Sequence, residues 1–174
     1  ILASDLRTIS GSSSVLSLDA GVGTDHLNVT TDLALVVLSD SQLSLGTDPD
    51  AIADLGAIIL ADDTFKGEVA SLTGGAGDTT FDLRNWRNGS SAQASVDGGT
   101  GTDTLIGPNK NSQATVVTWD LDGSDTGTVE TFDFDNIDNL TGGNASDRFL
   151  FQSGATISGQ IDGGDGDTNT IDVS

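Results

Sequence analysis

The chain has no cysteine, methionine or tyrosine, only two prolines and only six basic residues among its 174. Without cysteine it has neither a disulfide scaffold nor a thiolate metal site. Six Lys and Arg against 27 Asp and Glu give a formal net charge of −21, which repels nucleic-acid phosphates and anionic membrane surfaces. No apolar run approaches the roughly 18 residues that a membrane-spanning helix needs. We therefore expect no nucleic-acid partner and no membrane insertion.

What the chain has instead is glycine, 23 residues of it, in a pattern that recurs five times. The five segments are AGVGTDHLN from Ala20, GGAGDTTFD from Gly74, GGTGTDTLI from Gly98, GGNASDRFL from Gly142 and GGDGDTNTI from Gly163. Their starts lie 54, 24, 44 and 21 residues apart. These intervals indicate a unit of about 22 residues, with one insertion in the longest interval.

A longer repeat is superimposed on the glycine segments. The segments are preceded in alternation by Asp or by Leu-Thr, at Asp19, 72–73, Asp97, 140–141 and Asp162. This order predicts two long repeats, about 19–96 and 97–161, and the start of a third at 162–174. We expect residues 1–174 to be a single repeat domain and a fragment of a longer chain.

Between the glycine segments the sequence alternates as half-buried strands do. Val117, Trp119 and Leu121 alternate with polar neighbours, and so do Phe132 and Phe134. Short strands joined by glycine turns at a regular spacing predict an all-β fold. The favoured arrangement is a right-handed parallel β-solenoid, similar to a β-roll or β-helix, of roughly eight coils of about 22 residues. An antiparallel β-sandwich is the alternative.

One segment is ambiguous between helix and strand. Asp50 is a possible helix cap, and Ile52, Leu55 and Ile59 share a helical face. Gly56 lies in the middle of that segment and favours a strand over 57–60 equally well.

The glycine turns have the composition of a site for a hard cation. Glycine permits positive φ angles that turn carbonyl groups inward, and an acid two residues after the last glycine closes on the same point. Such oxygens suit calcium, whereas one His and no Cys leave zinc, copper and iron–sulfur chemistry without ligands. The candidate ligands are Asp25, Asp78, Asp97, Asp103, Asp147, Asp162, Asp165, Asp167, Gly75, Gly77, Gly99, Gly101, Gly143, Gly164 and Gly166.

The segments resemble the calcium-binding nonapeptide GGxGxDxUx of the repeat-in-toxin (RTX) family, where U is a large aliphatic residue. The segment from Gly98 to Ile106 matches at every position, with Asp103 as the acid and Leu105 as the inward residue. The first segment has Ala20 in place of the first glycine and keeps Asp25 as its acid.

The other three segments depart from the nonapeptide. Thr79 stands at the acid position of the second segment, with Asp78 one residue early. The fourth has Ala145 in place of its third glycine and keeps Asp147. The fifth has an extra residue, so that Asp165 or Asp167 has to serve.

The resemblance implies that calcium ions bind between turns that stack one coil apart. The pairs at Gly74 and Gly98 and at Gly142 and Gly163 are the best candidates for such stacking. The longer repeat also resembles units of very large secreted surface proteins of bacteria, often described as adhesins. It implies export, folding outside the cell in calcium, and a non-catalytic role as a stalk at the cell surface. The partners expected from this resemblance are calcium ions, neighbouring repeats and a surface glycan or protein.

Other hypotheses remain open from the sequence. Each turn can be a solenoid corner in which Asp caps loop amides without a metal. The cluster of Asp133, Asp135 and Asp138 indicates a solvated acidic face. A polysaccharide lyase, epimerase or hydrolase is the enzymatic alternative, although a chain with one His and no Tyr offers few bases. A third alternative is a flat face that binds a glycan or ice.

Overall fold

The structure, a computed structural model, describes residues 15–19, 26–31, 34–39, 42–46, 56–59, 69–85, 93–110, 115–166 and 168–174. Within these ranges the regular elements are all strands, so the expected all-β class is confirmed for the described part of the chain. The strands are β1 (Val15–Asp19), β2 (His26–Thr30), β3 (Leu35–Ser39), β4 (Gln42–Gly46), β5 (Gly56–Ile59), β6 (Val69–Thr73), β7 (Thr80–Asp82), β8 (Gln93–Asp97), β9 (Thr104–Ile106), β10 (Val116–Leu121), β11 (Gly127–Val129), β12 (Phe132–Asp135), β13 (Asn139–Thr141), β14 (Ser146–Phe151), β15 (Ile161–Asp162) and β16 (Thr170–Val173).

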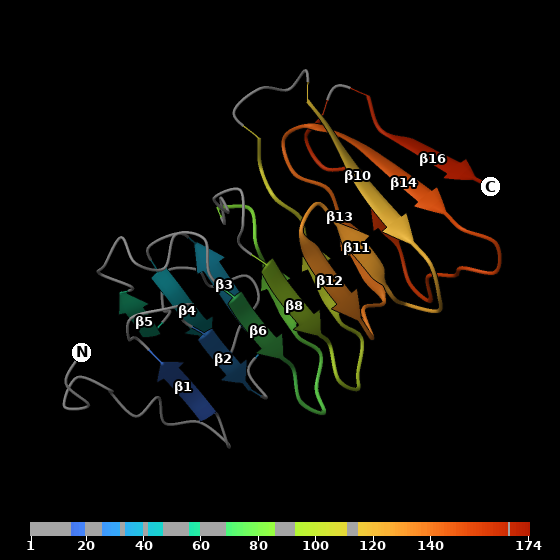
Figure 1. Cartoon of the computed structure of the whole chain (residues 1–174). Helices are drawn as coiled ribbons and strands as arrows, with labels where there is room; N and C mark the ends of the chain where they lie inside the picture. Colours follow the sequence, from blue (N-terminus) through green and yellow to red (C-terminus); the bar gives the residue numbers. More distant parts are fainter. Residues whose placement is uncertain are drawn as a thin grey trace.

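The strands form two sheets, and the order of sheet A can be followed in Figure 1. Sheet A has nine strands in the order β1-β2-β6-β8-β12-β11-β10-β14-β16. Sheet B has seven strands in the order β15-β13-β9-β7-β3-β4-β5. From β6 to β10, and again from β12 to β16, successive strands alternate between sheet A and sheet B. The chain therefore crosses from one sheet to the other after nearly every strand in these two stretches.

Four parallel pairs join strands that are separated in the chain by one strand of the other sheet, namely β6 with β8, β7 with β9, β13 with β15 and β14 with β16. Val69 of β6 pairs with Gln93 of β8, so that one full turn of the chain takes 24 residues there. Near the C-terminal end, Arg148 of β14 pairs with Thr170 of β16, and the turn takes 22 residues. These two intervals agree with the spacing of the glycine segments, because each segment is a turn between the two sheets.

Two antiparallel meanders interrupt the parallel order and make both sheets mixed. β3, β4 and β5 form one at the end of sheet B, and β10, β11 and β12 form the other within sheet A. Because the second meander adds residues between crossings, Thr104 of β9 pairs with Asn139 of β13, 35 residues later. The spacing is therefore not the uniform 22 residues that eight equal coils predict.

The ambiguous segment contains strand β5, Gly56–Ile59. It pairs antiparallel with β4, Leu43 lying opposite Ile58. The strand alternative is thus confirmed over residues 56–59, whereas residues 50–55 and 60 lie outside the described part of the chain.

The core lies between the two sheets and follows the predicted alternation. In β10 Val117, Trp119 and Leu121 are buried, and in β12 Phe132 and Phe134 are buried while the residues between them are exposed. Residues at the inward position of the nonapeptide share this core, namely Phe81, Leu105 and Phe149. The period-2 alternation therefore identified the buried face of both strands correctly.

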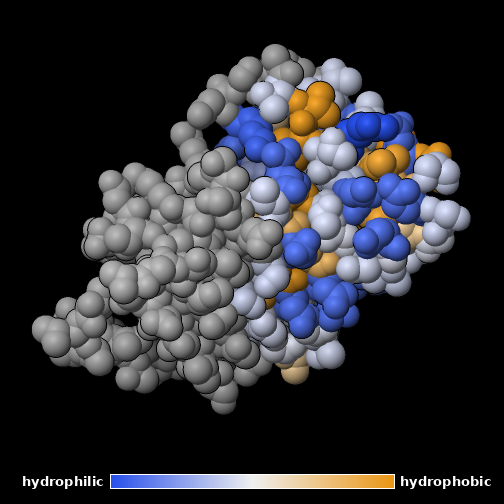
Figure 2. Space-filling view, in the orientation of Figure 1, coloured by the Kyte–Doolittle hydropathy of each residue, from blue (hydrophilic) through white to orange (hydrophobic). Residues whose placement is uncertain are grey.

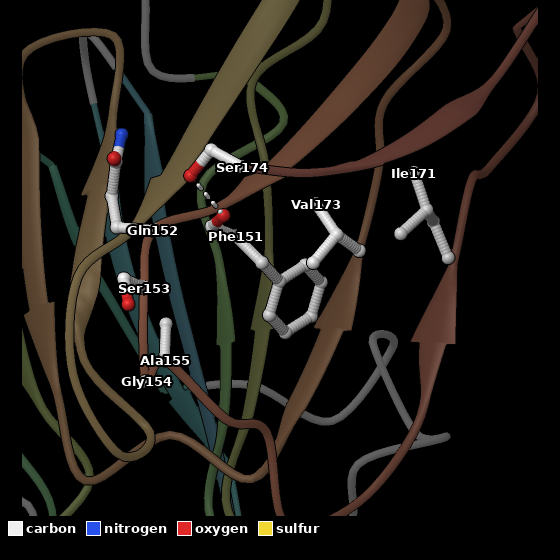
Figure 3. Close-up of a pocket in the computed structure, with 8 residues that line it drawn as sticks. All are labelled: Phe151, Gln152, Ser153, Gly154, Ala155, Ile171, Val173 and Ser174. Carbon is white, nitrogen blue, oxygen red and sulfur yellow. Dashed lines mark hydrogen bonds between the residues drawn. The ribbon is translucent and has the colours of Figure 1, made fainter.

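The core is uncovered at the last strand of sheet A. Phe149 of β14 is 1 % exposed, whereas Ile171, its neighbour in β16, is 60 % exposed. Val173 lies beside Phe151 and is 81 % exposed (Figure 3). An open groove of about 470 Å³ is lined by residues 151–155 together with Ile171, Val173 and Ser174. The groove is thus the exposed end of the core of the stack.

The described surface mixes polar and apolar residues. Figure 2 shows hydrophilic side chains interspersed with apolar ones over the described part of one face. In the described part of the chain no helix is long and apolar enough to cross a lipid bilayer.

Candidate cation sites in the glycine turns

The glycine turns lie at two opposite edges of the two-sheet stack. We name the edge at which the chain leaves sheet A the first edge, and the edge at which it leaves sheet B the second edge. The turns that start at Gly74 and Gly98 follow β6 and β8 and lie at the first edge. The turns that start at Gly142 and Gly163 follow β13 and β15 and lie at the second edge.

The turns at Gly74 and Gly98 stack in register at the first edge. The Gly74 amide donates to the carbonyl oxygen of Asp97 over 2.8 Å, and the Thr100 amide donates to that of Gly75 over 3.0 Å. The strands that follow also pair in parallel, with Phe81 opposite Leu105. The stacking predicted for this pair is therefore present.

The turns at Gly142 and Gly163 stack in the same way at the second edge. The Gly142 amide donates to the carbonyl oxygen of Asp162 over 2.8 Å, and the Asp165 amide donates to that of Gly143 over 2.9 Å. These bonds join the same positions of the nonapeptide as the bonds at the first edge. The backbone arrangement of one pair of turns thus recurs on the other side of the stack.

Asp103 is the buried acid of the first edge. Asp103 is only 1 % exposed, and its Oδ1 accepts a 2.8 Å hydrogen bond from the amide of Thr79 in the preceding turn. The amide of Asp103 in turn donates to Oδ2 of Asp138 over 2.8 Å. Oδ2 of Asp103 is buried and has no hydrogen-bond partner among the described residues.

Asp147 is the buried acid of the second edge and has the same distribution of contacts. It is 1 % exposed, and its Oδ1 accepts a 2.7 Å hydrogen bond from Nε1 of Trp119. Its amide donates to Oδ1 of Asn169 over 2.8 Å. Oδ2 of Asp147 is likewise buried without a hydrogen-bond partner in the described part of the chain.

Burial disfavours the charged form of both acids. It raises the pKa of Asp103 to about 6, against the hydrogen bond from Thr79, which lowers it. It raises the pKa of Asp147 to about 6 as well, against the hydrogen bond from Trp119. At neutral pH both groups are mainly ionised, so each site holds a buried negative charge with one unpaired oxygen.

The first glycine of each turn makes room for the acid of the same turn. A Cβ atom on Gly98 would lie 2.9 Å from Oδ2 of Asp103 and would collide with the carbonyl oxygen of Asn136. A Cβ atom on Gly142 would lie 2.5 Å from Oδ2 of Asp147 and would collide with the carbonyl oxygen of Gly163. A carboxylate oxygen and a carbonyl oxygen of the next turn therefore converge beside the same glycine at both edges.

Positive φ angles explain fewer of the glycines than the pattern suggested. Gly99 and Gly101 have φ angles of 86° and 132°, and Gly164 has one of 70°. Gly75 and Gly77 in the second segment do not have positive φ angles. Close approach of the stacked turns is the stronger reason for glycine, since a Cβ atom on Gly99 would collide with the carbonyl oxygen of Gly75.

Three other predicted ligands cap backbone amides. Oδ1 of Asp97 accepts from the amide of Gly99 over 3.0 Å, and Oδ1 of Asp162 accepts from that of Gly164 over 3.0 Å. Asp78 is exposed, and its Oδ1 accepts from the amide of Thr102 in the next turn over 2.8 Å. These acids act as turn caps, the metal-free role that the sequence also allowed.

The fifth turn has the amide Asn169 at the position where the third and fourth turns have Asp103 and Asp147. Oδ1 of Asn169 accepts a hydrogen bond from the amide of Asp147, just as Oδ1 of Asp103 accepts one from the amide of Thr79 at the first edge. The side chain of Asn169 packs beside Gly163. Asp165 is exposed, and Asp25 and the side chain of Asp167 lie outside the described residues. Counting back two residues from the inward Ile171, instead of forward from the glycines, would have identified Asn169.

Each of the two candidate sites offers a cation one buried carboxylate and a nearby backbone oxygen, that of Asn136 at the first edge and that of Gly163 at the second. Among the described residues no three or more Asp, Glu, His or Cys side chains gather around one point. Each site instead combines one buried carboxylate oxygen with carbonyl groups of stacked turns. This donor set is of the kind that calcium takes, and it excludes a ligand shell made only of side chains.

Comparison with protein-family models, with curated proteins and with solved structures finds no match to the chain.

Proposed function

We propose that this chain is a non-catalytic, calcium-stabilised structural and adhesive repeat module of an extracellular bacterial surface protein. In this proposal the parallel strand pairs and their glycine turns belong to a right-handed parallel β-solenoid. The observation that carries the proposal is the pair of buried carboxylates, Asp103 and Asp147, each with one unpartnered oxygen beside a glycine of a stacked turn. Both residues stand at the acid position of the RTX-like nonapeptide.

A buried ionised carboxylate with an unpaired oxygen destabilises a fold unless a cation compensates its charge. Residues Asp103 and Asp147 would hold calcium through Oδ2, while Oδ1 stays fixed by its donor. Calcium supplies the positive charge, and carbonyl oxygens of the turns supply further ligands. The sites on each edge would then join consecutive turns.

The small number of acids at each site predicts weak binding. Extracellular calcium modules have dissociation constants of about 10⁻⁴ to 10⁻³ M, and this range suits sites with one carboxylate each. Binding to the folded state alone adds about 2.7 kcal/mol of stability at a hundredfold excess over the dissociation constant. Folding would therefore be favoured outside the cell and disfavoured at cytosolic calcium concentrations.

The remaining acidity fits a solvated stalk. Asp133 and Asp135 are exposed on β12, as the sequence predicted for a solvated face, whereas Asp138, the third residue of that predicted face, is half-buried and accepts a hydrogen bond from the amide of Asp103. Neighbouring repeats and a surface glycan or protein are the partners that such a stalk would meet. The enzymatic and ice-binding hypotheses stay predictions, which an activity screen on polysaccharides and an ice-recrystallisation assay would test.

Calcium titration tests the proposal directly. Isothermal calorimetry at pH 7.5 should show binding in the submillimolar to millimolar range, and a chelator should lower the melting temperature. Magnesium at equal ionic strength is the control for general screening of the −21 charge. The matched variant is the double substitution Asp103→Asn and Asp147→Asn, which preserves shape and removes both buried charges.

The double variant should bind little calcium and keep the same melting temperature with and without chelator. A wild-type protein whose melting temperature responds equally to magnesium and calcium, or not at all to chelator, would overturn the proposal.

A further inference from the structure

Trp119 is the most constrained side chain near the second edge. It is fully buried, its ring stacks on Phe149 at a centroid distance of 5.3 Å, and the edge of Phe134 packs against it at 6.2 Å. A Cβ atom on Gly107 would collide with the indole, so the absence of a side chain there admits the ring. Residues of β12, of β14 and of the turn after β9 therefore surround the indole.

The indole N–H group can donate a hydrogen bond but cannot accept one. It donates to Oδ1 of Asp147 over 2.7 Å, a short bond of the strength expected for an ionised acceptor. With Oδ1 held in this way, Oδ2 is directed at Gly142, where the carbonyl oxygen of Gly163 also arrives. The direction of the free oxygen is thus set by a side chain from another strand.

At the first edge a backbone amide, and not a side chain, donates the hydrogen bond that fixes Oδ1 of the buried acid. Oδ1 of Asp103 accepts from the amide of Thr79, which any residue at that position would offer. The strand neighbour of Asp147 in β10 is Val117, and it is Trp119, two residues further along, that supplies the donor. The second edge therefore adds a side-chain donor, the indole of Trp119, and a hydrogen bond from the backbone of Gly143 also lowers the pKa of Asp147.

We propose that the buried indole of Trp119 is a positioning residue that orients Asp147 as the ligand of a second, independent cation site at the edge opposite Asp103. This inference rests on the proposed function, because it needs a cation to bind. It goes further in naming the side chain that orients Asp147 and in making the second site independent of the first. Trp119 would act through Asp147 without touching the ion.

Terbium(III) luminescence can locate the second site. Terbium replaces calcium at oxygen ligands and emits when a nearby excited indole transfers energy to it. The chain has two tryptophans, so that Trp86→Phe leaves Trp119 as the only donor. In this single-tryptophan protein, indole excitation should give terbium emission that excess calcium quenches. Asp147→Asn in the same background should abolish the emission, and Asp103→Asn should leave it within about twofold.

Affinity measurements separate positioning from packing. In an Asp103→Asn background, where only the second site remains, Trp119→Phe should weaken calcium binding by about tenfold or more, as loss of a partner behind a metal ligand does. Phe149→Leu is the matched control, because it disturbs the stacking on Trp119 but leaves the N–H group in place. It should destabilise the fold while changing the calcium affinity by no more than about twofold.

The outcomes distinguish the inference from the proposed function. Calcium binding that disappears entirely in Asp103→Asn, with no emission from the single-tryptophan protein, would overturn the second site, and the proposed function would then rest on Asp103 alone. Emission that survives Asp147→Asn, or equal losses of affinity in Trp119→Phe and Phe149→Leu, would also overturn it. Absence of calcium binding to the wild-type chain in calorimetry would overturn the proposed function itself.

Discussion

The two edges of the stack hold equivalent acids by different means. At the first edge Asp103 is held by the main-chain amide of Thr79, and at the second edge Asp147 is held by the indole of Trp119. A main-chain donor is present wherever two turns stack in register, whereas an indole is present only where the sequence encodes it. Register alone can therefore hold Asp103, whereas the orientation of Asp147 also depends on one side chain. The predictions below test this difference.

The largest loss of stability is expected when a side chain is added at the first glycine of a turn, where the stacked turns approach most closely. Gly98→Ala and Gly142→Ala should each destabilise the fold by about 3 kcal/mol, because the new methyl group collides with a carbonyl oxygen of the next turn. Urea-induced unfolding measures the loss. Gly77→Ala is the control, since a Cβ atom there meets nothing within 4 Å and the φ angle is not positive.

Gly77→Ala should change the free energy of unfolding by no more than about 1 kcal/mol, and in the stabilising direction. Equal losses in all three variants would mean that the turns do not stack as described.

The pH dependence of stability compares the two acids directly. Because burial raises the pKa of both from 3.8 to about 6, the folded state binds these protons more tightly than the unfolded chain does. This contribution is complete below about pH 4 and is lost as the pH rises through about 6. In chelator, the melting temperature of the wild type should therefore fall by about 5 °C or more between pH 5 and pH 8.

The single variants Asp103→Asn and Asp147→Asn should each remove part of this fall, and saturating calcium should remove most of it. Exposed acids are unchanged in the variants and supply the baseline. A fall that is identical in the wild type and the double variant would show that the buried acids do not cause it.

A smaller effect follows from the neutral side chain at the second edge. Asn169 accepts from the amide of Asp147 as Asp138 accepts from that of Asp103. Asn169→Asp adds a charge next to the second site and should tighten calcium binding there severalfold, by about 1 kcal/mol, because affinity rises with the ligand charge count. Asp138→Asn should weaken binding at the first edge by a similar factor. Calorimetry on variants that keep only one of the two sites measures both changes in calcium affinity. A change of the opposite sign in either variant would contradict the prediction.

The smallest effect is expected from an exposed turn cap. Asp78→Ala removes the hydrogen bond to the amide of Thr102 and should cost about 1 kcal/mol, with calcium affinity unchanged. Thermal unfolding with and without calcium measures both quantities. A loss of calcium affinity in Asp78→Ala would restore this residue to the ligand set predicted from the sequence.

Local alternation and spacing predicted much of the fold because they reflect local geometry. The buried faces of β10 and β12 follow from alternation alone, and the turns that stack follow from intervals of 24 and 21 residues between glycine segments. The meander of β10, β11 and β12 did not follow, because the interval of 44 residues that contains it equals two units of 22 residues and so gave no sign of extra strands. Asp103 and Asp147 were predicted from the motif, since their positions are fixed relative to the glycines.

The partners of those acids were not predictable in the same way. Trp119 reaches Asp147 through strand pairing between residues 28 positions apart, and no local pattern encodes that contact. Asn169 was missed because the extra residue in the fifth turn shifts the acid position when one counts from the first glycine. Predicting either residue requires the register of β14 against its two neighbours.

The alternation of the turns between the two edges has a mechanical consequence. Asp97 precedes a turn at the first edge, and Asp162, one long repeat later, precedes a turn at the second edge. An ion bound at one edge only would leave the two sheets free to separate at the opposite edge when the domain bends. Ions bound at both edges, at Asp103 and Asp147, would resist bending in either direction. The domain would then be stiffer and could transmit tension along its length.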